Sequence, residues 1–290
     1  IWLDGRDISQ IPVHKRNMGM VFQSYALFPH MSVAENVAFG LEMRGLPKTE
    51  RAAKVERALD LVKLAGYGDR RITQLSGGQQ QRCAIARSLV IEPDLLLLDE
   101  PLSNLDAKLR DEMREEIRDI QARTGVTAIF VTHDQDEALS MADRLAVMSA
   151  GKIEQIGTPR EIFDKPATEF VANFIGAGNF LSGTVREPGL AQVDGIGPVR
   201  FSTDHAVVGA VRLLIRPHRL TLNGPGENQF SGTVQHLVYR GDTLTLTVDV
   251  GDRPFLVDLP THAGTLPSRG DTVTLAVARD DVTMVGGAVS

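Results

Sequence analysis

The most constraining feature of this chain is the segment of residues 75–82, which reads LSGGQQQR. A Ser followed by two glycines and a polar run favours the start of a helix, where unpaired backbone N–H groups and the positive end of the helix dipole face outward. Because glycine has no side chain, a polyanion can approach the backbone there closely. The segment therefore predicts a phosphate-binding helix N-terminus.

Two acidic residues, Asp99 and Glu100, follow a run of leucines at residues 95–98. A short apolar run that ends in acids is typical of a buried parallel strand. A carboxylate at such a strand end reaches Mg²⁺ through water, and its neighbour polarises an attacking water. An isolated acid pair would be an ordinary strand end, but this pair continues into PLSNLD at residues 101–106, which favours a functional site.

The pattern around the acid pair predicts a parallel α/β sheet in the first part of the chain. Residues 126–131 are mostly apolar or β-branched, which indicates a second buried strand, and His133 follows that strand. Helical spacing and charge predict helices over residues 49–64, 107–123 and 134–142. Strands and helices that alternate in this way, with acids at strand carboxyl ends, are typical of such a sheet.

The pattern of apolar and turn-forming residues in the sequence changes after Gly151. From about Asn179 onward, short alternating runs are separated by Gly, Pro and Asp, which predicts an all-β domain. A weak repeat relates FLSGTV at residues 180–185 to FSGTV at residues 230–234, and it predicts a small barrel built from two related halves. We place the domain boundary between residues 176 and 177, which gives domains of residues 1–176 and 177–290.

Composition excludes several classes of protein. The net charge of −6 argues against a broad nucleic-acid surface, so we expect no nucleic-acid partner. No apolar run reaches the length of about 20 residues that a membrane-spanning helix needs. The single cysteine, Cys83, excludes an internal disulfide, and its place in the predicted helix after residue 76 favours a buried apolar residue over a reactive thiol.

In order and spacing, the LSGGQQQR segment, the acid pair, SNLD at residues 103–106 and THD at residues 132–134 resemble the nucleotide machinery of the ATP-binding-cassette (ABC) ATPases. The resemblance implies an α/β fold: a partial P-loop NTPase domain with a parallel sheet and a helical signature subdomain, followed by an all-β, OB-like TOBE domain. Residues 150–176 resemble bacterial importer ATPases of this kind. Residues 176–185 are most similar to the spermidine/putrescine importers, with ferric-iron and sugar importers as near neighbours.

The resemblance also implies roles for individual residues, with ATP and Mg²⁺ as cofactors. Glu100 would be the general base, and His133 would contact the γ-phosphate and hold the attacking water. Asp99 and Gln23 would serve the metal. The nucleotide-binding residues implied by the resemblance are Gln23, Ser76, Gly77, Gly78, Gln79 and Asp106. By contrast, we expect Arg82 and Arg87 to pair with the body of the protein.

Partners follow from the same resemblance. The signature would complete the nucleotide site of a second copy, which implies a head-to-tail homodimer, and Asp106 would lie in the loop that crosses that interface. Residues 28–31 look like a docking surface for one of two membrane permease subunits, which an extracytoplasmic solute-binding protein would serve. The expected location is the cytoplasmic face of the inner membrane, as a peripheral subunit that energises uptake of a small solute.

One family motif does not occur in this sequence. The phosphate-binding pattern G-x-x-x-x-G-K-[ST] is absent from residues 1–290. In the family that loop lies upstream of a segment resembling residues 1–8, so we expect an N-terminal part that carries it, and we expect the 290-residue chain alone to bind and hydrolyse ATP poorly. The alternatives are a non-catalytic or regulatory fragment, which ATP binding would distinguish, and an ABC protein of DNA repair or translation. The last would need coiled coils or tandem cassettes, and the sequence shows neither.

A further departure lies at residues 216–218, RPH, where relatives place an acid after Arg-Pro.

Overall fold

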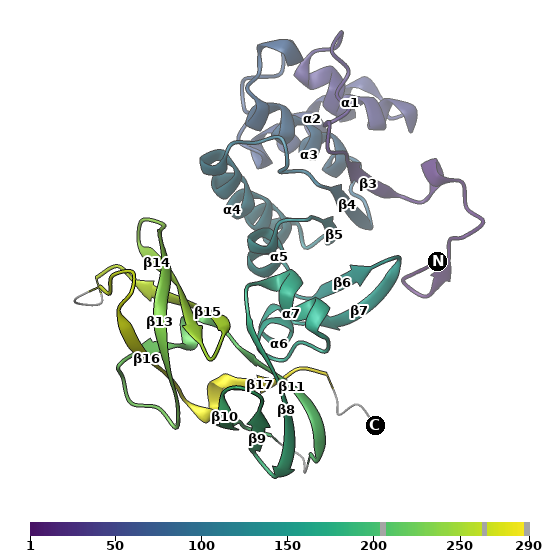
Figure 1. Ribbon diagram of the computed structural model, residues 1–290. Coiled ribbons are helices and arrows are strands. Elements are labelled where there is room, and N and C mark those ends of the chain that lie inside the picture. The colour runs from purple at the N-terminus through teal and green to yellow at the C-terminus, as the bar shows by residue number, and fades with distance from the viewer. Residues whose placement is uncertain (204–206, 263–265, 287–290) are drawn as a thin grey trace. The chain divides into compact units, whose positions relative to one another are not determined.

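The computed structural model describes residues 1–203, 207–262 and 266–286 (Figure 1). The chain divides into two compact units, Ile1–Met141 and Ala142–Ser290, which we describe separately. The boundary predicted between residues 176 and 177 follows the change in sequence texture and lies inside the second of these units. It stays a prediction, which an experiment on fragments tests below.

A parallel sheet organises the first unit (Figure 1). Its strand order is β3-β4-β5, and both neighbouring pairs are parallel, as predicted from the sequence. A short antiparallel pair, β1-β2, precedes it. The strands of this unit are β1 (Trp2–Leu3), β2 (Arg6–Asp7), β3 (Met18–Val21), β4 (Leu95–Asp99) and β5 (Thr127–Val131). The three parallel strands therefore end at one edge, where Gln23, Asp99, Glu100 and His133 follow.

Five helices accompany this sheet. Helices α1, α2 and α3 pack against one another, and α3 also contacts β3. They share an apolar core with the buried face of the sheet and with α4. The helices of this unit are α1 (Val33–Met43), α2 (Lys48–Leu61), α3 (Gly77–Leu89), α4 (Ala107–Thr124) and α5 (Gln135–Met141). Short 3-10 turns, η1 (Val13–Lys15) and η2 (Ile72–Gln74), lie in the connections.

Strand β5 differs from the sequence-based expectation of a fully buried strand. Ile129 and Val131 are exposed by 52% and 50%, whereas Phe130 packs against the apolar core. Within the described residues β5 lies at the edge of the sheet, and only one of its faces meets the helices. Apolar composition identified the strand but not which of its faces is covered.

The second unit begins with a hairpin and two short helices. Strands β6 (Leu145–Ser149) and β7 (Lys152–Gly157) pair antiparallel, and helices α6 (Pro159–Asp164) and α7 (Glu169–Ile175) follow. Arg216, at the departure noted in the sequence, is only 6% exposed. Its guanidinium donates to the carbonyls of Phe163, Ala172, Gly176 and Ala177, at distances of 2.8 to 3.2 Å. A cation at the C-terminal end of α7 also complements the helix dipole.

The all-β part consists of two five-stranded antiparallel sheets among the described residues (Figure 1). Their orders are β10-β9-β8-β11-β17 and β15-β14-β13-β16-β12. The strands are β8 (Asn179–Glu187), β9 (Leu190–Val193), β10 (Gly197–Arg200), β11 (Gly209–Ile215), β12 (Thr221–Leu222), β13 (Asn228–Tyr239), β14 (Thr243–Val250), β15 (Arg253–Pro260), β16 (Thr272–Val277) and β17 (Val282–Met284). Each half contributes four strands to its own sheet and, after a 3-10 turn (η3, Pro217–Arg219, or η4, Arg279–Asp281), one short strand to the other sheet.

The sequence repeat marks equivalent positions in these two halves. Strands β8 and β13 carry the repeat and are each central in a sheet. A Cβ on Gly183 would lie 2.8 Å from the Gln192 carbonyl oxygen, and one on Gly232 would lie 2.6 Å from that of Asp249. Both glycines are therefore required by the close approach of the neighbouring strand, β9 or β14. The predicted parallel α/β sheet and the predicted all-β part are both present in the structure.

Candidate active site

The candidate active site lies where the three parallel strands end. Gln23 follows β3, Asp99 and Glu100 end β4, and His133 follows β5. Glu100 has a backbone φ of 44°, and its N–H donates to the Val131 carbonyl of the neighbouring strand at 3.0 Å. This left-handed turn breaks the strand geometry directly after Asp99.

One carboxylate oxygen of Glu100 faces two of the predicted residues. Nε2 of Gln23 donates to Oε2 of Glu100 at 3.1 Å, and Nδ1 of His133 lies 3.2 Å from the same oxygen. The Glu100 side chain is 31% exposed, whereas that of His133 is 72% exposed. The fold thus brings together three residues that are separated by up to 110 positions in the sequence.

Two residues that sequence analysis assigned no role hold Gln23 in place. Nε2 of Gln23 also donates to Oγ of Ser103 at 3.1 Å, and Ser103 Oγ donates to the Glu100 carbonyl at 3.0 Å. Nδ2 of Asn104 donates to the Gln23 carbonyl at 2.8 Å. Ser103 and Asn104 lie in the SNLD segment, which the sequence pattern already marked as part of a functional site. The pattern did not predict that these two residues hold Gln23.

Asp99 and the amide oxygen of Gln23 offer the oxygen ligands that the expected Mg²⁺ would need. Both residues are exposed, and Gln23 directs its nitrogen, not its oxygen, toward Glu100. No cluster of three or more His, Cys, Asp or Glu suited to a metal occurs among the described residues. Mg²⁺ usually keeps several waters and binds through one or two protein oxygens together with substrate phosphates, so this sparse set fits it.

The signature segment forms a capped helix N-terminus, as its sequence predicts. Ser76 is the N-cap of α3: its Oγ accepts from the Gln79 N–H at 3.4 Å, and Oε1 of Gln79 accepts from the Ser76 N–H at 3.0 Å. This reciprocal pair satisfies two donors and leaves the N–H groups of Gly77 and Gly78 outside the helical ladder.

The start of α4 lies directly beside this helix end. A Cβ on Gly78 would lie 3.1 Å from the methyl carbons of Leu109, and one on Gly77 would lie 3.6 Å from Cδ2 of Leu105. Asp106 is the N-cap of α4, and its Oδ1 accepts from the Leu109 N–H at 3.1 Å. The predicted nucleotide-binding residues therefore form two groups: Gln23, Asp99, Glu100 and His133 at the sheet edge, and residues 76–79 with Asp106 at two adjoining helix N-termini.

The other signature-helix residues have structural contacts. Arg82 pairs with the buried Glu116 of α4 at 2.7 Å, and Arg87 donates to the carbonyls of Tyr25 and Ala26, so both pair with the body of the protein as expected. Cys83 is fully buried, and burial raises the pKa of its thiol to about 12.

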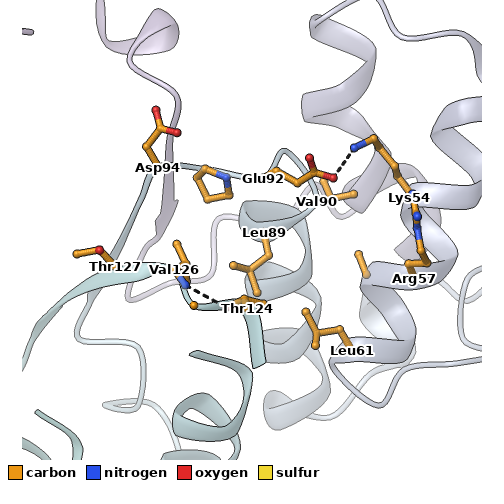
Figure 2. A pocket seen from close by; sticks show the side chains of 13 residues that line it. Lys54, Arg57, Leu61, Leu89, Val90, Glu92, Asp94, Thr124, Val126 and Thr127 are labelled. Atoms are coloured by element: carbon orange, nitrogen blue, oxygen red, sulfur yellow. Dashed lines mark hydrogen bonds and ion pairs between the residues drawn. The ribbon is translucent and has the colours of Figure 1, made fainter. Parts of the chain in front are cut away.

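Two cavities lie in this unit. A small one of about 40 Å³ lies beside Glu100 and His133 and is also lined by Ser103, Arg110, Thr132, Asp134 and Glu137. A larger groove of about 570 Å³ lies between α2 and the C-terminal ends of α3 and α4. Figure 2 shows that groove, with the Lys54 ammonium directed at the Glu92 carboxylate. None of the predicted site residues lines it, so volume alone does not identify the site.

Similarity to known proteins confirms the predicted fold class, an ABC-type α/β domain followed by an all-β OB-like domain. A family model described as ABC transporter matches residues 1–103, and one described as TOBE domain matches residues 213–285. An Fe(3+) ions import ATP-binding protein of Rhizobium etli is 46% identical over 279 residues, which cover 94% of this chain and 78% of the relative. A spermidine/putrescine import ATP-binding protein of Mesorhizobium japonicum is 46% identical over 289 residues, covering 97% and 79%. Its counterpart in Acetivibrio thermocellus is 48% identical over 237 residues, covering 82% and 67%. No helix in the described part of the chain is both long and apolar enough to span a bilayer.

Proposed function

This chain belongs to the ATP-binding proteins of ABC importers, which are ATPases, and we propose that Glu100 is the general base of their ATP hydrolysis in this protein. The observation that carries this proposal is the convergence of Gln23, Glu100 and His133 at the carboxyl edge of the sheet. Oε2 of Glu100 is engaged by both partners, at 3.1 Å and 3.2 Å, which orients the carboxylate toward an attacking water.

His133 would complete this arrangement from the other side. Its side chain is exposed and is directed to Glu100 through Nδ1, so its Nε2 is available for a γ-phosphate oxygen. Asp99 and the Gln23 amide oxygen would hold Mg²⁺ together with water and phosphate oxygens. When bound, the metal neutralises negative charge on the phosphates.

The signature would act on the nucleotide of a second copy. The N-termini of α3 and α4 adjoin, and the exposed residues Ser76, Gly77 and Asp106 lie at them. Two positive helix ends with unpaired N–H groups favour a polyanion, which supports a head-to-tail dimer with ATP between the copies.

Residues 28–31 would contact a membrane permease subunit. Pro29 and His30 are exposed, whereas the Phe28 ring packs on Phe39 at a centroid distance of 4.7 Å. The buried Asn36 accepts from the Phe28 N–H at 2.8 Å and donates to its carbonyl at 3.0 Å, so this surface is held rigidly. We propose that the protein acts as a peripheral subunit at the cytoplasmic face of the inner membrane, where two permease subunits and an extracytoplasmic solute-binding protein complete the importer.

We propose a polyamine as the transported solute, with ferric iron or a sugar as the alternatives. Residues 176–185 resemble the spermidine/putrescine importers, and relatives named for each solute match this chain at similar identity. Uptake of labelled spermidine, putrescine and ferric iron, compared between cells with and without the gene, separates a polyamine from ferric iron.

Substitution of the proposed base tests the ATPase site. In a version of the protein that also carries the phosphate-binding loop, Glu100→Gln should lower hydrolysis by about 10²–10⁴-fold, because the amide keeps the shape but cannot take a proton from water. Binding of ATP should persist, and the dimer should be stabilised in a closed state. The control Glu92→Gln alters an exposed acid away from the site and should hydrolyse ATP normally. Near-wild-type turnover of Glu100→Gln would place the base elsewhere.

A further inference from the structure

Arg110, in the first turn of α4, contacts two loops that flank the site. Its Nη2 donates to the Leu105 carbonyl at 3.2 Å, and its Nη1 donates to Oδ2 of Asp134 at 3.4 Å. Leu105 immediately precedes Asp106, and Asp134 immediately follows His133. A single guanidinium therefore bridges the loop of the proposed dimer contact and the loop that carries the proposed phosphate contact.

A buried carboxylate holds the second of these loops. Glu137 is 3% exposed, and its Oε2 accepts from Oγ1 of Thr132 at 2.6 Å. Thr132 Oγ1 in turn accepts from the Asp134 N–H at 2.9 Å, and Oδ1 of Asp134 accepts from the Glu137 N–H at 3.0 Å. The residues on both sides of His133 are thus anchored to Glu137.

Arg110 also compensates the charge of that carboxylate. Its Nε is buried, and among the described residues it has no hydrogen-bond partner, but it lies 3.9 Å from Oε1 of Glu137. Removal of the guanidinium would leave two neighbouring carboxylates, Asp134 and Glu137, without their cation, which is costly for a buried group.

The His133 ring depends on this network for its orientation. Its side chain is 72% exposed, and its contact with Glu100 is made by Nδ1 alone. A ring with so little packing around it is directed mainly by the backbone of residues 132–134, because neighbouring side chains do not confine its rotamer.

We infer that Arg110 is a positioning residue, which holds His133 against Glu100 and ties that contact to the Asp106 loop. The inference rests on the proposed roles of Glu100 and His133. Through Arg110, a displacement of Leu105 when a second copy binds is transmitted to Asp134 and so to His133. The network lies entirely within the first unit and needs no contact outside it.

A spectroscopic test needs no nucleotide. In the protein labelled with ¹⁵N-histidine, His133 should show an Nδ1–H that donates to Glu100. A His133→Gln variant assigns the signal among those of the other histidines. In Arg110→Met, the signal should shift toward the Nε2–H tautomer. Arg110→Lys should restore part of the original signal, and Lys108→Met, an exposed charge on the same helix turn, should leave it unchanged.

Kinetics provide the second measurement. Arg110→Met should lower kcat by about 10- to 100-fold, the scale that a misplaced catalytic group costs, with KM for ATP nearly unchanged. Glu100→Gln, measured in the same assay, distinguishes failure of the proposed catalytic site from failure of the positioning role of Arg110. If Glu100→Gln hydrolyses ATP normally, the proposed catalytic site is wrong. If it is inactive but Arg110→Met behaves as wild type, the positioning role of Arg110 is wrong.

A second, more conservative variant tests the inference if Arg110→Met does not fold. Asp134→Asn keeps an amide oxygen for the Glu137 N–H and removes the charge that faces Arg110. It should shift the His133 signal in the same direction. An unchanged His133 tautomer in a folded Arg110→Met, or in Asp134→Asn where Arg110→Met does not fold, would overturn the inference.

Discussion

At the scale of single residues, Glu100 combines a strained backbone with a side chain that contacts two other site residues. A φ of 44° costs a non-glycine residue about 1–3 kcal/mol, and such residues persist where surrounding contacts over-determine them. Here the contacts are the Val131 carbonyl on the backbone and Gln23 and His133 on the side chain. Nine other described non-glycine residues also have a positive φ, so the side-chain contacts, and not the φ, support a functional role for the Glu100 carboxylate.

Cys83 belongs to the same scale, and its burial predicts an inert thiol. Burial raises its pKa from 9.0 to about 12, so it stays protonated at neutral pH. Iodoacetamide at pH 8 should label the native protein far more slowly than the chain unfolded in urea. Comparable labelling rates in both states would contradict the burial of Cys83.

The same shift gives a pH dependence of stability. The pKa of the Cys83 thiol is higher in the folded state than in the unfolded state. The contribution of this thiol to the free energy of unfolding is therefore fully present below about pH 9 and is lost as pH rises toward 12. Denaturant unfolding measures this effect. Between pH 8 and pH 10.5, the free energy of unfolding should fall less for Cys83→Ala than for the wild type.

At the scale of elements, the two halves of the all-β part hold each other through equivalent asparagines. Asn179, in β8, accepts from the Leu256 N–H at 2.7 Å and donates to the Leu256 carbonyl at 2.8 Å, in the other sheet. Asn228, in β13, accepts from the Arg200 N–H at 2.7 Å and donates to its carbonyl at 2.9 Å. Both amides are buried, so each repeat begins with a clamp on the opposite half.

The two repeat glycines predict that a Gly→Ala substitution lowers the free energy of unfolding about equally in either sheet. Gly232→Ala would place a Cβ 2.6 Å from the Asp249 carbonyl oxygen, and Gly183→Ala would place one 2.8 Å from that of Gln192. Each should lower the free energy of unfolding by about 1–3 kcal/mol, because backbone must move to relieve the contact. Chemical denaturation measures this, with the exposed Ser231→Ala as the control. Wild-type stability in both glycine variants would mean that the strands lie farther apart.

At the scale of the whole molecule, the all-β part and the two helices before it form one unit. Arg212 pairs with Glu169 of α7 through both nitrogens of its fork, at 2.8 and 2.9 Å, and Arg216 binds the carbonyls at the ends of α6 and α7. The apolar face of α7, which includes Ala172, packs near Leu214 and Val285. A boundary placed after residue 176 cuts all of these contacts.

Fragments of this unit test the boundary. We expect residues 142–290 to unfold cooperatively, and residues 177–290 to be less stable, because Arg216 would lose three of its four carbonyl acceptors, those of Phe163, Ala172 and Gly176. Circular dichroism melts of the two fragments measure the difference. Equal melting temperatures would support the boundary between residues 176 and 177.

Local patterns in the sequence determined the elements and their ends. Ser76 predicts a helix start because its short polar side chain satisfies an N–H group only a few residues away. The leucine run before Asp99 predicts a buried strand, and the repeat predicts two related halves, since each depends on residues close in the chain. Glu100 and His133 stood out because they follow predicted strands, whereas Gln23 was named by the resemblance to ABC ATPases. The resemblance also supplied the catalytic roles, which remain predictions.

The tertiary structure decided what these elements meet. The exposed face of β5, the exchange of β12 and β17 between sheets, and the Arg110 network depend on contacts across 20 to 80 positions. Periodicity records whether a side chain faces an apolar surface, but it does not record which residue lies opposite. The role of Arg110 therefore could not be inferred from its place in a charged helix. It became visible only where Leu105, Asp134 and Glu137 converge on one guanidinium.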